Sequence, residues 1–157
     1  MTETYGVSLA DGYPRLRADI RRNLRRGWRE LAADGLDAQV AFVPLAADPE
    51  LRHEITAAYL ARAAAAGRPV SLDGLTGAWE TATEAAVLRT GGKLAAWLLA
   101  APAPQAYRVL GGQMVPGFER YRPGRILEAM TLARAMLAGW DRVDWGPGHP
   151  ESLIAVS

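Results

Sequence analysis

"YRPGRILEAMTLARAMLAGWDRVDWGPG", residues 121–148, contains a turn, a helical pattern and a short strand pattern in that order. Pro123-Gly124 forms the turn, and apolar residues then recur at helical spacing, namely Ile126, Met130, Ala133 and Leu137. Gly139 is the expected helix stop, and RVDWG at 142–146 is typical of a strand. A helix between two strands is the usual connection of parallel neighbours, so we expect the last strand to lie parallel to the strand before residue 121.

Upstream of residue 121 the sequence predicts six further elements, two helices and four strands. Residues 14–35 form an amphipathic helix whose buried stripe is Leu16, Ile20, Leu24, Trp28 and Leu31. A strand of about six residues follows and ends at Pro44. A second helix spans 48–67, with Asp48 as N-cap and Pro49 at its first position. Residues 70–84 indicate a loop with a short helical turn around Trp79.

Three strand-like runs follow, at 85–90, 94–101 and 105–117. Gly91-Gly92 between the first two predicts a tight hairpin. Gly111-Gly112 within the third indicates a bulge or a close approach of a ligand, and an ordinary hairpin turn is the alternative. The complete order is α-β-α-β-β-β-α-β. It predicts an α/β (α+β) fold in which helices flank a mixed, mostly antiparallel sheet.

The composition excludes several classes of protein. At 157 residues the chain fits one domain, which we expect to span 1–157. It has no cysteine and only two histidines, His53 and His149, so we expect no metal site. No apolar run is long enough to cross a bilayer and the N-terminal residues have no apolar core, so we predict a cytoplasmic protein without a membrane partner.

The net charge is only +1, so any basic surface must be local. The first helix concentrates arginines, among them Arg21, Arg22, Arg25 and Arg26. This face could follow the phosphates of tRNA or dock an acidic carrier protein, and the alternative is a solvated helix face.

The run GGKLAAWLLAAPAPQAYRVLGGQMVPGFERYRPGRILEAMTLARAMLAGWDRVDWGPG, residues 91–148, resembles the GNAT superfamily of N-acyltransferases. It is most similar to the branch with cellulose-biosynthesis-type acetyltransferases and Fem-type aminoacyl-tRNA-dependent transferases. The shared features are the Gly-Gly hairpin, a strand rich in Tyr and Gly, a Tyr-x-Pro-Gly turn, a helix ending in Gly and a strand with Asp. The resemblance ends before the last strands of the complete fold, so we expect either that a second copy completes the sheet or that the protein is a shortened version.

The resemblance implies a coenzyme A site at the Pro-Gly turn. A helix N-terminus has unpaired backbone N–H groups that bind phosphate, and two arginines flank this one. The implied pyrophosphate site is Arg122, Pro123, Gly124, Arg125 and Ile126, and its alternative is an ordinary helix start. The strands before and after the helix splay apart in the family, and the pantetheine arm binds between them. Here Gln113, Met114 and Val115 would bind that arm.

Acyl transfer to an amine also requires a base and often an acid. We expect Asp144, at the end of the last strand, to be the base, with Glu84 and Glu80 as other candidates. Tyr107 and Tyr121 could serve as acids. His149 is a further catalytic candidate, whereas His53 lies within a helix and fits a structural role.

These features predict an enzyme that transfers an acyl group from acetyl-CoA or another acyl-CoA to an amine of a small molecule or peptide. An aminoacyl-tRNA-dependent transferase is the alternative with a different donor. A non-catalytic domain that binds a ligand or partner is the third possibility, and a homodimer would suit the missing strands.

Overall fold

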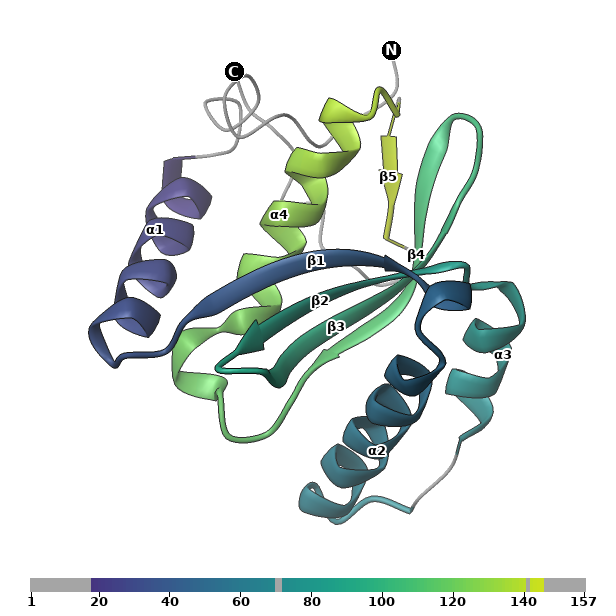
Figure 1. Cartoon of the computed structure of the whole chain (residues 1–157), viewed down its shortest axis with the longest axis horizontal. Helices are drawn as coiled ribbons and strands as arrows, with labels where there is room; N and C mark the ends of the chain where they lie inside the picture. The colour runs from purple at the N-terminus through teal and green to yellow at the C-terminus, as the bar shows by residue number, and fades with distance from the viewer. Residues whose placement is uncertain (1–17, 70–71, 141, 146–157) are drawn as a thin grey trace.

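A five-stranded sheet forms the centre of the protein in a computed structural model that describes residues 18–69, 72–140 and 142–145 (Figure 1). The strands are β1 Ala38–Pro44, β2 Glu84–Thr90, β3 Lys93–Pro102, β4 Ala106–Met114 and β5 Arg142–Asp144. They lie in the order of the chain; the first four are antiparallel, and β5 is parallel to β4. The mixed, mostly antiparallel α/β (α+β) fold is therefore confirmed.

The β2–β3 hairpin shows how the sequence determines the sheet register. Gly91 and Gly92 both have positive φ angles, 56° and 83°. Two successive residues of this kind form the tight turn whose twist matches that of paired strands, and glycine adopts it without steric cost. The predicted hairpin is confirmed, with Thr90 opposite Lys93.

Two pairs of helices cover the two faces of the sheet, which gives three layers (Figure 1). The helices are α1 Ala18–Ala33, α2 Pro49–Ala65, α3 Asp73–Thr81 and α4 Pro123–Leu137, with short 3₁₀ turns at Leu45–Ala47 and Glu119–Tyr121. As predicted, Asp48 is the N-cap of α2, where its side chain accepts a hydrogen bond from the Leu51 N–H at 3.2 Å. Helices α1 and α4 pack on one face, and α2 and α3 pack on the other.

Each face of the sheet has its own hydrophobic core because successive strand residues point to opposite faces. On the first face Leu24 and Leu31 of α1 and Leu127 of α4 pack over Leu88 and Leu98. On the second face the buried residues are Leu51, Ile55, Leu75, Ala85, Val87, Leu94, Trp97 and Leu99. We call these two sides the α1/α4 face and the α2/α3 face.

Of the predicted buried stripe of α1, the structure describes the side chains of Leu24, Trp28 and Leu31, and Trp28 differs from the prediction. Trp28 is 37% exposed, and Gly27 lies in the helix contact in its place. A Cβ on Gly27 would approach the Ile126 side chain to 2.9 Å and the Tyr121 carbonyl to 3.2 Å. Glycine at this position therefore allows α1 to lie close to the start of α4, while the neighbouring indole of Trp28 lies at the surface. The predicted helix start at Pro14 lies outside the described residues.

Two further predictions need correction. Residues 73–81 form a continuous helix, α3, where we expected a loop with one helical turn around Trp79. Leu75 anchors that helix in the core of the α2/α3 face, so tertiary burial outweighs its glycines. In α4, Met130 is half-buried although its spacing placed it on the buried side, while Ile126 and Ala133 are buried as expected.

Among the helices of the described residues, none is both long and apolar enough to cross a membrane. The single domain over 1–157 remains a prediction, because nothing in the structure tests it.

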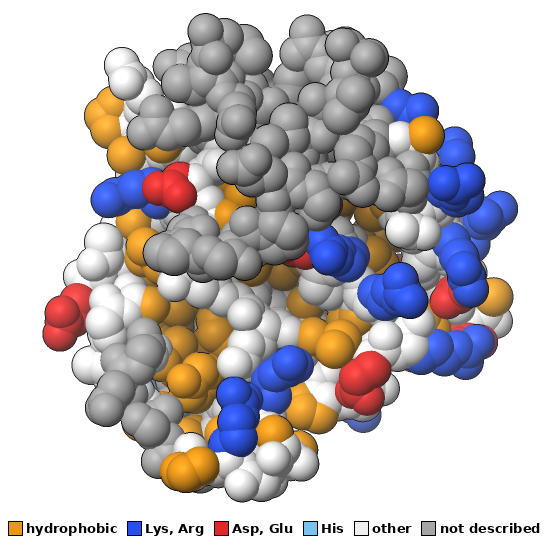
Figure 2. Space-filling model, turned by 180° about the vertical axis from the view of Figure 1, so that it is seen from behind, with side chains coloured by type: hydrophobic (Ala, Val, Ile, Leu, Met, Phe, Trp, Pro, Cys, Tyr) orange, Lys and Arg blue, Asp and Glu red, His pale blue; other side chains and the backbone are white. Residues whose placement is uncertain are grey.

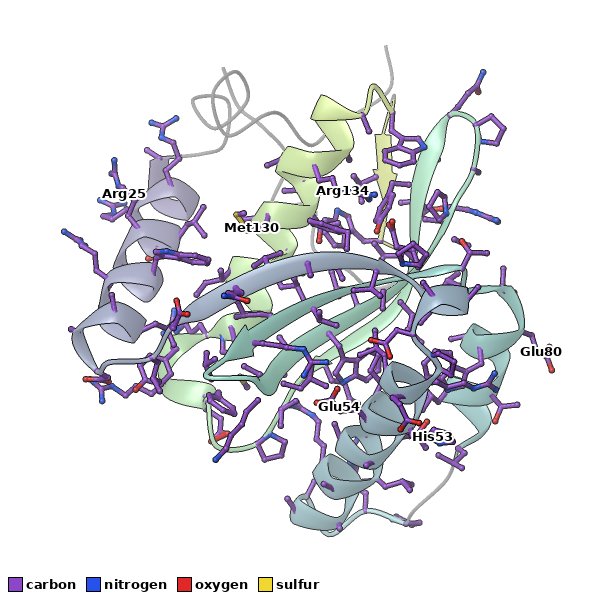
Figure 3. All side chains as sticks on the ribbon, viewed as in Figure 1. Arg25, His53, Glu54, Glu80, Met130 and Arg134 are labelled. Carbon is purple, nitrogen blue, oxygen red and sulfur yellow. The ribbon has the colours of Figure 1, made fainter. Side chains whose placement is uncertain are left out.

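Glu54 of α2 binds Arg89 of β2 through two hydrogen bonds of 2.6 and 2.8 Å (Figure 3). The hydrogen bonds from Arg89 lower the pKa of Glu54 below its ordinary value of 4.5, against a smaller opposing effect of burial. A carboxylate whose pKa is lowered in the folded state stabilises the fold above its unfolded pKa, and this stabilisation disappears as the pH falls through the folded pKa.

We therefore expect Glu54→Gln to cost about 0.5 kcal/mol at pH 7, since both partners are partly exposed, at 29% and 39%. The difference from the unmodified protein should shrink as the pH drops below 4.5. Urea unfolding between pH 7 and pH 3 measures it, with the exposed Glu80→Gln as control. A deficit that persists unchanged at acid pH would contradict the ion-pair explanation.

Candidate functional site: the free edge of β4 and the start of α4

The outer edge of β4 is paired along only part of its length. Strand β5 pairs with β4 at Ala106, Tyr107 and Arg108, opposite Arg142, Val143 and Asp144. From Val109 to Met114, β4 has no strand partner on that side among the described residues. Gly112, in the middle of this segment, is exposed. The two strands are therefore joined at the start of β4, and the rest of its edge offers backbone groups for hydrogen bonding.

The glycine pair in β4 lies next to a bulge. Val109 pairs with Ala100 and Gly111 pairs with Leu99, so Leu110 is an extra residue in the strand. The predicted bulge is present, and the alternative hairpin turn at Gly111-Gly112 is wrong because both residues continue the ladder with β3. A Cβ on Gly112 would overlap the Leu98 side chain and the Trp97 carbonyl, so this position requires glycine.

Of the three residues expected to bind a pantetheine arm, only Met114 directs its backbone to the free edge. The Val115 N–H donates to the Ala95 carbonyl at 2.8 Å, so Val115 faces β3. Antiparallel strands alternate between residues bonded to the partner and residues facing outward, so Gln113 faces β3 and Gly112 and Met114 face outward. The Met114 carbonyl accepts a hydrogen bond of 2.9 Å from Arg62 Nη1 of α2.

The backbone at the start of α4 is less open than the sequence suggested. The Arg122 N–H donates to the backbone carbonyl of Glu119. The N–H groups of Arg125 and Ile126 both donate to the Arg122 carbonyl, at 3.0 and 3.4 Å. Pro123 has no N–H group. The expectation of bare amides throughout this turn is therefore wrong. Gly124 has the only N–H in 122–126 without a backbone partner among the described residues, and a Cβ there would meet no atom within 4 Å.

Two arginines flank the amide of Gly124. The side chain of Arg125 is 54% exposed and lies 3.7 Å from Glu128, and Arg122 is also exposed. Arg122 has a φ of 50°, in the left-handed region that non-glycine residues rarely adopt. One N–H without a backbone partner, an open position at Gly124 and two exposed arginines thus lie within four residues at the helix start, a combination suited to an anion.

Glycine at positions 122 and 125 should have opposite effects on stability. We expect Arg122→Gly to raise the free energy of unfolding by up to about 1 kcal/mol because it relieves the left-handed strain. Arg125→Gly should lower it by about 1 kcal/mol because it places glycine inside the helix. Both variants should bind coenzyme A about threefold to tenfold more weakly, through loss of one charge-assisted contact. Urea unfolding and calorimetric titration measure the two quantities, and a loss of stability in both variants would contradict the strain at Arg122.

Glu84 and Tyr107 lie in a buried polar cluster with Arg134 of α4 (Figure 3). Both terminal nitrogens of Arg134 donate to the Glu84 carboxylate, each at 2.8 Å, and the Tyr107 hydroxyl donates to the same carboxylate. Tyr107 is 1% exposed. Burial is the main reason that the pKa of Tyr107 is raised, and the hydrogen bond to Glu84 raises it further.

The same cluster is enclosed by aromatic rings. The Arg134 guanidinium lies 4.5 Å from the centre of the Phe42 ring and 5.7 Å from those of Tyr107 and Trp140. The Trp140 indole N–H donates to the Ala103 carbonyl at 2.8 Å. The Glu84 carboxylate accepts three hydrogen bonds within the cluster, and the Tyr107 hydroxyl is buried. The cluster connects β2, β4 and α4, and this geometry favours a structural role for Glu84 and Tyr107.

The other acid and base candidates are scattered. Asp144 is exposed at the end of β5, opposite Arg108, where the β4–β5 pairing stops. Glu80 is exposed on the outer side of α3, and His53 is exposed on α2 (Figure 3). The Tyr121 hydroxyl donates to Asp34 at the end of α1, which raises the pKa of Tyr121. His149 lies outside the described residues.

Sequence reasoning missed Arg62 and Arg134. Both lie in helices, where an arginine is usually solvated, and nothing in the local pattern shows that they reach strand residues far away in the chain. No group of three or more His, Cys, Asp or Glu residues within the described residues could hold a metal ion.

A family model supplies the decisive comparison, because the acetyltransferase (GNAT) domain matches residues 18–151, which is most of the chain. The chain belongs to this GNAT family. The GNAT domain is also similar to a crystal structure of the C-terminal domain of a predicted lysylphosphatidylglycerol synthetase from Agrobacterium fabrum, with a TM-score of 0.60 and 17% identity. That match covers 82% of this chain and 40% of the other chain, and at this identity it shows the fold alone. No curated protein matches the sequence.

Proposed function

We propose that this GNAT domain transfers an acyl group from an acyl-CoA to an amine of a small molecule or peptide. One observation carries the proposal: the free edge of β4 beyond Arg108 leads to an α4 N-terminus that has an open space at Gly124. The family match makes the chain a member of a transferase family. We further propose that its donor is an acyl-CoA and its acceptor an amine.

The donor would bind along β4 as an added strand does. The amides of its pantetheine arm would pair with the outward-facing backbone of Gly112 and Met114, and its pyrophosphate would lie against Gly124, Arg122 and Arg125. Pairing with the Met114 carbonyl requires that Arg62 release it. This charge-assisted hydrogen bond is worth about 1.5–3 kcal/mol, and the hydrogen bond from the pantetheine amide would replace part of it.

In the transfer step the amine nitrogen attacks the thioester carbonyl. The new N–C bond forms, the C–S bond breaks, and the sulfur leaves with the bonding electron pair. The amine loses one proton, which finally protonates the thiolate. Asp144 is our candidate base because it is exposed at the point where β4 and β5 part. We assign no acid, since Tyr107 is buried against Glu84.

Coenzyme A binding and thiol release test this proposal directly. We expect coenzyme A to raise the melting temperature, and acetyl-CoA with a panel of amines to release free thiol, detected with a chromogenic disulfide. Asp144→Asn should lower kcat with little change in the affinity for coenzyme A. No thermal shift and no thiol release with any amine would refute the acyl-CoA proposal.

The arginine face of α1 favours a second candidate, an aminoacyl-tRNA-dependent transferase of the Fem-like branch. Arg22, Arg25, Arg26 and Arg29 are exposed on α1, and Lys and Arg side chains gather on that side of the molecule (Figure 2). Retention on immobilised tRNA that disappears when Arg21, Arg22, Arg25 and Arg26 are replaced by glutamine would support this donor. Binding of coenzyme A or tRNA without any transfer would support the non-catalytic domain. An acidic carrier, a homodimer and a cytoplasmic location remain predictions.

A further inference from the structure

Two residues at directly paired positions on the α2/α3 face each carry a buried polar atom without a hydrogen-bond partner. Trp97 of β3 pairs directly with Gln113 of β4, and paired residues point to the same face. The Trp97 indole N–H and the Gln113 side-chain oxygen have no partner within the described residues, although Trp97 is only 2% exposed. One group is a donor and the other an acceptor, and leaving both buried and unpaired is unfavourable.

Arg62 approaches the same part of β4 from α2. Its Nη1 donates to the carbonyl of Met114, the residue after Gln113, at 2.9 Å. No carboxylate of the described residues pairs with this guanidinium, which is half-buried. A guanidinium has several donors in a planar fork that fits a carboxylate, and one neutral carbonyl uses only one of them.

The strand next to these groups is not covered. Gly111 lies opposite Leu99, whose side chain belongs to the core of the α2/α3 face, so a Cβ on Gly111 would point to that face. No atom lies within 4 Å of that Cβ position. An open position therefore lies on the same face of β4 as Gln113, two residues before it in the strand.

We propose that Arg62, Trp97 and Gln113 recognise the acceptor, and that this acceptor is a peptide with a free carboxylate. Arg62 binds the carboxylate, the Trp97 indole N–H donates to the peptide carbonyl, and the Gln113 oxygen accepts the peptide N–H. This inference rests on the proposed acyl transfer, whose donor would lie along the free edge of the same strand. It names the class of acceptor, which the transfer itself does not specify.

Glycylglycine and glycylglycine amide are a matched pair of probes, since they share the amine and the peptide bond and differ in the carboxylate. With acetyl-CoA we expect kcat/KM to be at least tenfold higher for glycylglycine, mainly through KM. Arg62→Gln should abolish that preference, Arg62→Lys should retain part of it, and the control Arg68→Gln, an exposed arginine just after α2, should leave it unchanged.

Equal turnover of the two probes would overturn the acceptor assignment and leave the transferase proposal intact. Turnover of no amine at all would refute the transferase proposal, and a binding experiment would then decide the site by itself. The indole N–H signal of Trp97, assigned with Trp97→Phe, should shift in an ¹⁵N-resolved NMR spectrum on titration with glycylglycine. It should shift less with the amide, and no shift with either probe would overturn the site.

Discussion

Replacing Arg134 by methionine should lower the free energy of unfolding by about 3 kcal/mol, because it breaks a mostly buried ion pair and leaves one charge without its partner. The Glu84 side chain is 11% exposed and would keep only the hydrogen bond from Tyr107. We expect a loss of stability near the lower end of the range of about 3–5 kcal/mol for breaking a buried ion pair, because the Arg134 side chain is 32% exposed. Urea unfolding followed by tryptophan fluorescence measures it.

The double variant Glu84→Gln with Arg134→Met separates the buried charge from the packing. It removes both charges, so we expect it to recover most of the lost stability. Arg125→Met is the control, because its pair with Glu128 is longer, at 3.7 Å, and more exposed, and its removal should cost less than about 1 kcal/mol. A double variant as unstable as Arg134→Met alone would show that the guanidinium acts through its packing against Phe42, Tyr107 and Trp140.

The order of the elements could be predicted because each depends on a local pattern. Two glycines of positive φ define the β2–β3 turn, and Asp48 and Pro49 define the start of α2. After Pro123, apolar residues recur at the spacing of a helix, which is α4. The α3 helix was missed because its glycines argue against a helix locally, whereas its stability comes from Leu75 in a core that the rest of the fold supplies.

The site was harder to predict for a physical reason. The Pro-Gly turn is a local feature, and it does lie at the start of α4. Which of its amides are free depends on the turn before it, where the Arg122 carbonyl accepts two N–H groups. The arginines that bind Glu84 and Met114 lie in helices, 50 and 52 residues away in the chain, and no sequence spacing encodes those contacts.

Replacing Gly124 by valine should weaken coenzyme A binding by about tenfold to a hundredfold, the loss expected when one or two charge-assisted contacts to phosphate are blocked. The branched side chain would occupy the open position at Gly124, where a Cβ meets no atom within 4 Å. Stability should change by less than about 1 kcal/mol, since no atom is close enough to clash and valine is acceptable in a helix. Calorimetric titration with coenzyme A and urea unfolding measure the two effects.

Gly77→Val is the matched control, because Gly77 also lies in a helix, α3, and a Cβ there would meet no atom within 4 Å. We expect Gly77→Val to bind coenzyme A as the unmodified protein does, so that a difference between the two variants reports on position 124 alone. Gly124→Ala should show an intermediate loss, since a methyl group fills less of the space. If Gly124→Val binds coenzyme A normally, the phosphate does not lie at the start of α4, and the donor site proposed along β4 is wrong even though the fold is that of a GNAT domain.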